Sequence, residues 1–103
     1  MGSCVGDVRA FPKEARQRAG YELYQVQSGL DPSDWKPMGA IGAGVREIRI
    51  HTKVEHRVIY IAKFAEAVYV LHAFEKRTRR SRPADLELAR RRLAAVLASR
   101  RAR

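Results

Sequence analysis

The chain has 103 residues, which suffices for one domain with a single core and excludes a two-domain enzyme. Lysine and arginine total 21 against 11 acidic residues, a formal charge of +10, which favours RNA, DNA, an acidic protein or an anionic membrane as partner. The single cysteine excludes an internal disulfide, no Cys/His cluster has metal-ligand spacing, and no apolar run is long enough to span a bilayer. We expect one cytoplasmic domain over residues 1–103, without metal or cofactor.

The N-terminal quarter has helical spacing. Apolar residues in 7–27 recur at intervals of three and four, with Pro12 and Gly20 as expected breaks, which predicts two short helices or one kinked helical hairpin. Residues 28–44 concentrate Gly, Pro, Asp and Ser, which predicts a loop anchored by Trp35.

The middle of the chain has the alternation of strands. Three strands joined as an antiparallel meander are predicted over Val45 to His51, His56 to Phe64 and Ala67 to Phe74. In the first, Ile48 and Ile50 face one side while Glu47, Arg49 and His51 face the other, which indicates a strand with one solvated face.

The third predicted strand is apolar on both faces, which favours a central position in the sheet with cover on each side. Simple alternation groups its side chains as Val68, Val70 and Phe74 on one face and Tyr69, Leu71 and Ala73 on the other.

After Pro83 an apolar stripe of Leu86, Ala89, Leu93 and Leu97 predicts a C-terminal helix. The predicted fold class is therefore α+β: a small antiparallel sheet with N-terminal helices packed on one face and a C-terminal helix.

An ordered set of segments, "WKPM", "VREIRI", "HRVIYIAKF", "VYVLHAFEKRT" and "LARRRL", resembles the phage-derived branch of the RelE/HigB superfamily, the toxins of type II toxin–antitoxin systems. The resemblance covers nearly the whole chain. It implies a RelE-like fold, cleavage of messenger RNA, often on the ribosome, and restraint by a cognate antitoxin that commonly carries a helix-turn-helix. Relatives begin with a strand before the turn that matches residues 2–4, and this chain starts at that turn. Either the start codon is placed too far downstream or the usual first strand is lost, and in the second case a sheet edge is exposed for a homo- or hetero-oligomer.

The candidate catalytic residues follow from this resemblance. RNA is cleaved by its own 2′-hydroxyl, and arginine suits the task of stabilising charge on the phosphorane. Arg57 and Arg77 match the family's arginines on the second predicted strand and just beyond the last, and Arg49 matches a basic position on the neighbouring strand. His72 is the candidate for proton transfer because histidine titrates near neutral pH, although a lone histidine in an apolar strand is more often a satisfied core group. A surface ion-pair network of Arg49 and Arg57 with Glu47 is the alternative interpretation.

The candidate RNA-binding residues are the cations Lys76, Arg46, Arg79, Arg80 and Arg82, and a merely solubilising role is the alternative for each. Two other functions stay open: a nucleic-acid-binding module without catalysis, and an inactive relative that only binds its antitoxin. The expected partners are messenger RNA, the ribosome and an antitoxin whose inhibitory segment is acidic, because that segment must cover or distort a basic site.

Overall fold

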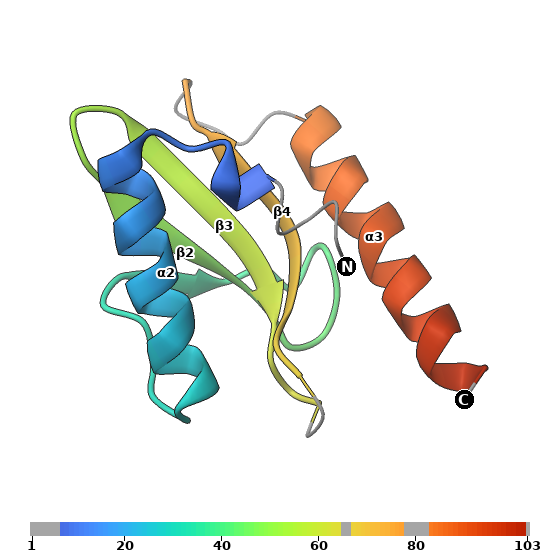
Figure 1. The fold of residues 1–103 in the computed structure, drawn as a ribbon. Helices are drawn as coiled ribbons and strands as arrows, with labels where there is room; N and C mark the ends of the chain where they lie inside the picture. Colours follow the sequence, from blue (N-terminus) through green and yellow to red (C-terminus); the bar gives the residue numbers. More distant parts are fainter. Residues whose placement is uncertain (1–6, 65–66, 78–82, 103) are drawn as a thin grey trace.

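The computed structural model describes residues 7–64, 67–77 and 83–102. Four antiparallel strands form one sheet in the order β1-β2-β3-β4, and two long helices flank it, α2 on one side and α3 on the other (Figure 1). The elements are α2 (Lys13–Gln27), β1 (Trp35–Pro37), β2 (Val45–His51), β3 (Glu55–Ile61), β4 (Tyr69–Glu75) and α3 (Pro83–Arg101). The α+β prediction is confirmed. The expected loss of the first strand concerns residues 1–6, which lie outside the described residues.

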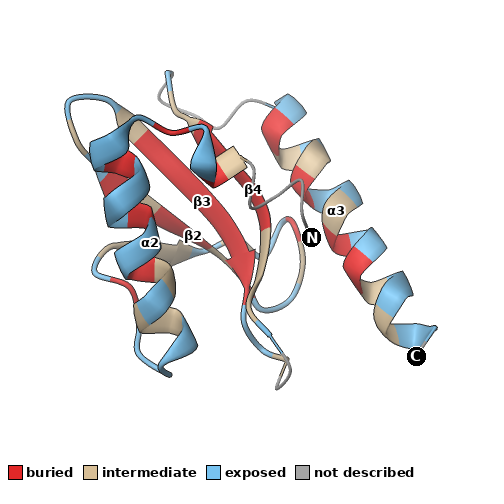
Figure 2. Cartoon of the chain, in the orientation of Figure 1, coloured by how far each residue is buried: buried red, intermediate tan, exposed pale blue. Residues whose placement is uncertain are grey.

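The core has two layers, one on each face of the sheet. Burial concentrates on the strands and on the sides of the helices that face them (Figure 2). The α2 layer contains Val8, Phe11, Ala15, Ala19, Ile48, Ile50, Val58, Tyr60 and Ala73. The α3 layer contains Ile41, Val45, Ile59, Ile61, Leu71, Phe74, Ala89, Leu93 and Val96. Both predicted helical stripes therefore pack on the sheet, and apolar burial on two faces stabilises it.

Two details of the helical and loop predictions are wrong. Helix α2 runs unbroken through Gly20, because a single exposed glycine weakens a helix without ending it. The predicted loop 28–44 contains strand β1, whose Trp35 lies opposite Ile48 of β2. A strand of three residues that includes a proline is too short to show alternation.

Strand β4 contains a bulge at Leu71. Ile59 of β3 lies opposite His72 and the next residue, Tyr60, lies opposite Val70, so the register passes over Leu71. One extra residue reverses the alternation beyond it. As a result Ala73, and not Phe74, shares the α2 layer with Val68 and Val70, which corrects the predicted grouping.

The predicted central position of this strand is also wrong for the part of the chain that the structure describes. There β4 pairs only with β3 and ends the sheet. Its two apolar faces arise because both helix layers pack on it, as predicted from its composition.

Gly42 marks a close contact between the loop before β2 and α3. A Cβ atom on Gly42 would lie 2.4 Å from Cδ2 of Leu93, which is buried in the α3 layer. We expect Gly42→Ala to lower the free energy of unfolding by about 1–3 kcal/mol, the range for overpacked cores. Urea unfolding checks this; Gly39→Ala, whose Cβ would meet nothing within 4 Å, is the control.

Candidate functional site

Four cations and one carboxylate meet on the sheet face that carries the α3 layer. The register places Arg49 of β2 opposite Arg57 of β3 and Lys36 of β1 opposite Glu47 of β2. Arg57 alternates with Ile59, a member of the α3 layer, which identifies the face. Lys76, just after β4, joins the group, since its charge interacts with those of the other four residues. We call these five residues, Lys36, Glu47, Arg49, Arg57 and Lys76, the Glu47 cluster.

Glu47 lies at the floor of this cluster and is 0% exposed. Its Oε1 is 3.6 Å from Nε of Arg57, 3.9 Å from Nε of Arg49 and 4.0 Å from Nζ of Lys36. At these distances the pairs attract by charge alone: neither Glu47 oxygen and neither of the two Nε atoms has a hydrogen-bond partner. The carboxylate therefore gathers the cations without saturating their donors.

The side chains of the cluster become more exposed from Glu47 at its floor to the residues at its rim. Arg57 is 6% exposed, whereas Arg49, Lys36 and Lys76 are half-buried. Burial, and then the charge of Arg57, lowers the pKa of Lys76 from its ordinary value. The cluster is therefore a shallow basic surface whose lysine loses its proton more readily than a free lysine does.

A chain of polar contacts extends the cluster to the β2–β3 turn. Arg57 donates from Nη1 to Oε1 of Glu55 at 3.2 Å. Nδ1 of His51 lies 2.8 Å from the same oxygen, and Nε2 of His51 lies 2.5 Å from Oδ2 of Asp34. Hydrogen bonds to Asp34 and then to Glu55 raise the pKa of His51, and the bond to His51 is the largest cause that lowers the pKa of Glu55. The predicted solvated face of β2 thus holds only at its His51 end, which is exposed.

His51 predicts a small pH dependence of stability. Its pKa is raised in the folded chain, so its contribution is fully present below about pH 6.5 and is lost as the pH rises through the folded value. Since the ring is half exposed, we expect less than about 1 kcal/mol. Urea unfolding from about pH 6 to about pH 9 measures the decline, which should disappear in His51→Gln and shrink at high salt. An unchanged decline in His51→Gln would assign it to another group.

The other predicted cations do not join the cluster. Arg77 is exposed and donates to Glu75 at 2.7 Å, and Glu75 lies opposite His56 at the end of β4. Arg46 alternates to the α2 side of the sheet and binds Asp31 at 3.1 Å. Arg79, Arg80 and Arg82 lie outside the described residues. Of the predicted basic residues, the structure brings together Arg49, Arg57 and Lys76.

His72 stands apart, held by carboxylates from two segments. Its Nε2 lies 2.8 Å from Oδ1 of Asp85 on α3 and its Nδ1 lies 3.5 Å from Oδ2 of Asp7. Arg92 of α3 binds the same Asp7 oxygen and the carbonyl of Leu71. With 8% exposure, the ring ties β4 to α3 and to the N-terminal turn.

Sequence reasoning missed two members of the site. Lys36 stands in the segment predicted as a loop, so nothing assigned it to a sheet face. Glu55 was a turn residue with no role, yet it bridges His51 and Arg57. A register for the β2–β3 hairpin would have revealed Glu55, because that register sets Glu55 opposite His51.

In the part of the chain that the structure describes, no three His, Cys, Asp or Glu side chains are grouped as a metal site. None of the helices found there combines the length and apolarity needed to cross a membrane.

Comparison with known protein families places the chain beside a phage-derived family. The family described as "Phage derived protein Gp49-like (DUF891)" matches residues 6–94, a range that contains the whole Glu47 cluster. No curated protein and no solved structure matches the chain.

Proposed function

Because the chain belongs to the phage-derived Gp49-like family, we propose that it is the toxin of a type II toxin–antitoxin system, an endoribonuclease that cleaves messenger RNA on the ribosome. The observation that supports this most is the Glu47 cluster: four cations around a buried carboxylate, with free donors on two arginines. A formal charge of +10 favours an RNA substrate.

The proposed reaction needs no metal. The 2′-hydroxyl oxygen attacks the adjacent phosphorus, the bond from phosphorus to the 5′-oxygen breaks, and a 2′,3′-cyclic phosphate and a 5′-hydroxyl remain. Arg57 and Arg49 stabilise the negative charge that grows on the phosphoryl oxygens, because their donors are already oriented and partly desolvated.

Two protons move in this reaction. The proton of the 2′-hydroxyl passes to water, and Lys76 donates one to the departing 5′-oxygen. The lowered pKa of Lys76 makes it a better acid than a free lysine. His72 receives no step in this proposal, since its ring nitrogens face Asp85 and Asp7.

The experiment is inducible expression in a bacterial host with RNA 5′-end mapping within minutes. We expect growth arrest and new 5′-hydroxyl ends within translated messages. Arg91 is an exposed cation on α3, so Arg91→Ala is the matched control for Arg57→Ala and should stay toxic. Intact messages and normal growth at confirmed soluble expression would refute the nuclease proposal.

A second candidate is an RNA-binding module of the same fold without catalysis. The observation that favours it is the shortage of proton-transfer groups at the cluster, whose five residues include no histidine or tyrosine. This candidate predicts salt-sensitive RNA binding without cleavage. In either case we propose a cognate antitoxin with an acidic segment as the partner that covers the cations.

A further inference from the structure

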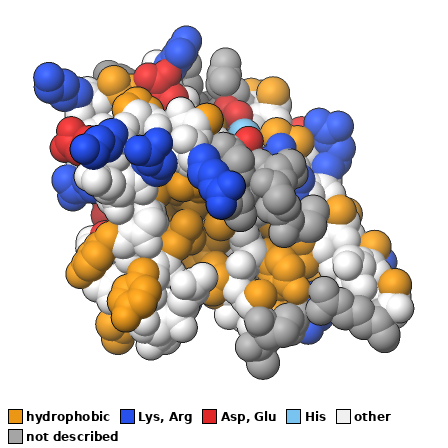
Figure 3. Space-filling model, in the orientation of Figure 1, with side chains coloured by type: hydrophobic (Ala, Val, Ile, Leu, Met, Phe, Trp, Pro, Cys, Tyr) orange, Lys and Arg blue, Asp and Glu red, His pale blue; other side chains and the backbone are white. Residues whose placement is uncertain are grey.

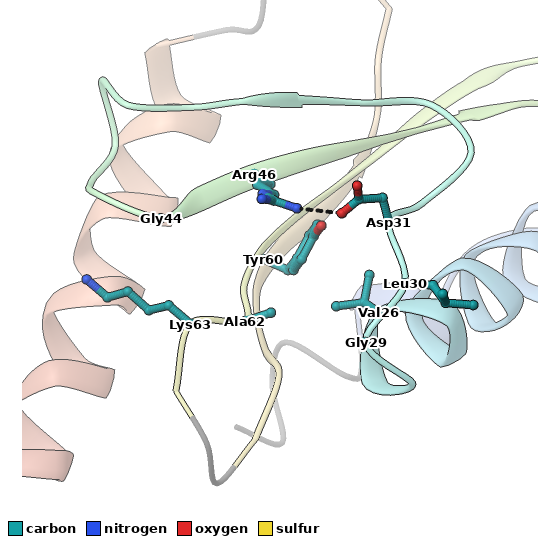
Figure 4. Close-up of a pocket in the computed structure, with 9 residues that line it drawn as sticks. All are labelled: Val26, Gly29, Leu30, Asp31, Gly44, Arg46, Tyr60, Ala62 and Lys63. Carbon is teal, nitrogen blue, oxygen red and sulfur yellow. Dashed lines mark hydrogen bonds and ion pairs between the residues drawn. The ribbon is translucent and has the colours of Figure 1, made fainter.

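A polar pocket lies on the α2 side of the sheet, whereas the Glu47 cluster lies on the α3 side. It has a volume of about 260 Å³ and lies between the C-terminal end of α2, the start of β2 and the end of β3. Its lining residues are drawn in Figure 4. We call it the Tyr60 pocket.

The hydroxyl of Tyr60 is the unusual group in this pocket. Tyr60 is 1% exposed, and its hydroxyl has no hydrogen-bond partner. In Figure 4 the oxygen points toward the ion pair of Arg46 and Asp31, at the mouth of the pocket. Burial raises the pKa of Tyr60, with Arg46 acting against the shift, so the hydroxyl keeps its proton and can donate it. A buried hydroxyl without a partner costs stability, which suggests a role beyond packing.

Arg46 supplies the second set of donors. Its guanidinium carbon lies 4.0 Å from the centroid of the Trp35 ring, a cation–π contact that fixes the plane of the group. Nη1 binds Asp31 at 3.1 Å, and the guanidinium also lies close enough to the Tyr60 hydroxyl to oppose the rise of its pKa. The fork has five donors, so Arg46 can bind a further acceptor beside the Tyr60 hydroxyl. The ion pair with Asp31 shows that Arg46 can bind a carboxylate at this place.

The pocket also has apolar walls. They come from Val26, Leu30 and Ala62, and Lys63 contributes a second cation to the lining. Val26 and Ala62 also line a neighbouring depression of about 440 Å³ that includes Phe64 and Val68. Figure 3 shows hydrophobic side chains gathered over the lower half of this view, on and beside α2, while lysine and arginine gather above. The surface thus offers a neutral and a charged donor next to an apolar depression that shares Val26 and Ala62 with the pocket.

We propose that the Tyr60 pocket binds a glutamate or aspartate carboxylate carried by an acidic protein segment, with apolar neighbours of that residue lying in the adjacent depression. Tyr60 and Arg46 donate to the carboxylate, and the apolar walls hold its methylene groups. An RNA phosphate is the poorer occupant, because a polyanionic strand gains little from apolar walls, and the two cations that line the pocket, Arg46 and Lys63, stand beside the carboxylate of Asp31. The proposal is independent of RNA cleavage, since the pocket and the Glu47 cluster lie on opposite faces of the sheet.

The test uses the full chain and defined probes. The ¹⁵N-labelled protein is titrated with acetyl-Ala-Leu-Glu-Leu-Ala-amide, with the same peptide carrying Gln in place of Glu, and with inorganic phosphate. We expect the Glu peptide to shift the amides of Gly44, Arg46 and Tyr60 and to bind at least about tenfold more tightly than the Gln peptide, as hydrogen bonds to a charged group imply.

Two variants separate binding from folding. Tyr60→Phe should weaken the Glu peptide about tenfold while the Tm stays equal or rises, because it removes a hydroxyl that has no partner. Asp31→Asn should strengthen binding roughly two- to fivefold, because it removes the carboxylate that competes for Arg46. The opposite signs exclude a general loss of structure as the cause.

Three results would overturn the proposal. The first is equal affinity of the Glu and Gln peptides. The second is phosphate shifting the same amides as strongly as the Glu peptide, which would make this an unselective anion site. The third is a Tyr60→Phe variant with a lower Tm and unchanged peptide affinity, which would make the hydroxyl structural. Toxicity and RNA cleavage in Tyr60→Phe should match the wild type, so failure here is distinguishable from failure of the proposed nuclease.

Discussion

Replacement of Arg57 by alanine is expected to lower the rate of RNA cleavage by about 10²- to 10³-fold, the usual effect of removing one preorganised donor from a developing oxyanion. Arg57 is the most buried cation of the Glu47 cluster, and its Nε has no hydrogen-bond partner. Its charge is therefore already placed and desolvated before substrate arrives. The measurement is single-turnover cleavage of a ribosome-bound message by purified protein.

Arg57→Lys is the informative companion variant. Lysine keeps the charge beside Glu47 and Glu55 but loses the planar fork, so we expect a folded protein with a rate between those of wild type and Arg57→Ala. Arg91→Ala, remote from the cluster, should cleave at the wild-type rate. If Arg57→Lys and Arg57→Ala both cleave like the wild type while folded, Arg57 has no part in the reaction.

The second large effect is expected at Glu47. Its carboxylate is fully buried and lies within 4.0 Å of charged nitrogens on three strands. Glu47→Ala leaves these cations facing one another without compensation, and we expect a loss of about 3 kcal/mol, the lower end for broken buried ion pairs. For a chain of this size that corresponds to a fall in Tm of roughly 10–20 °C. Thermal unfolding by circular dichroism measures it.

An external anion should stabilise Glu47→Gln, which lacks the same carboxylate as Glu47→Ala. Once the internal carboxylate is gone, the cluster gains affinity for an external anion, so sulfate should raise the Tm of Glu47→Gln more than that of the wild type. Lys76→Gln in the same background should reduce the rescue. Equal stabilisation of wild type and Glu47→Gln by sulfate would mean that the Glu47 carboxylate does not fill a site that an external anion can occupy.

Much of the fold was predictable because its elements repeat a simple pattern. Alternation placed β2 at residues 45–51, where the structure has it, and the stripe after Pro83 identified the face of α3 that packs on the sheet. Strand β1 was not predictable, since three residues carry no period. The bulge at Leu71 was hidden for a different reason: a strand that is apolar on both faces reads the same in either phase.

The site was predictable in its parts and not in its arrangement. Arg49 and Arg57 were expected on one face, and their direct opposition follows from a register that the sequence does not contain. Glu47 was expected on a solvated face. It is buried among charged side chains that come from three strands, and this arrangement depends on the pairing of all three.

Because of the bulge at Leu71, the sheet face on which a side chain of β4 lies does not follow from odd or even residue number in the same way along the whole strand. The residues before the bulge and the residues after it obey opposite odd and even assignments, and the one extra residue that the register passes over reconciles the two. Deleting any one residue within the strand would move one half of it through the sheet, so that buried and cationic positions, Lys76 among them, exchange sides. Inserting two residues keeps the side chains on the same faces of the sheet, whereas inserting one residue moves them to the opposite faces. The number of residues in this segment is thus as much a determinant of the basic surface as their identity.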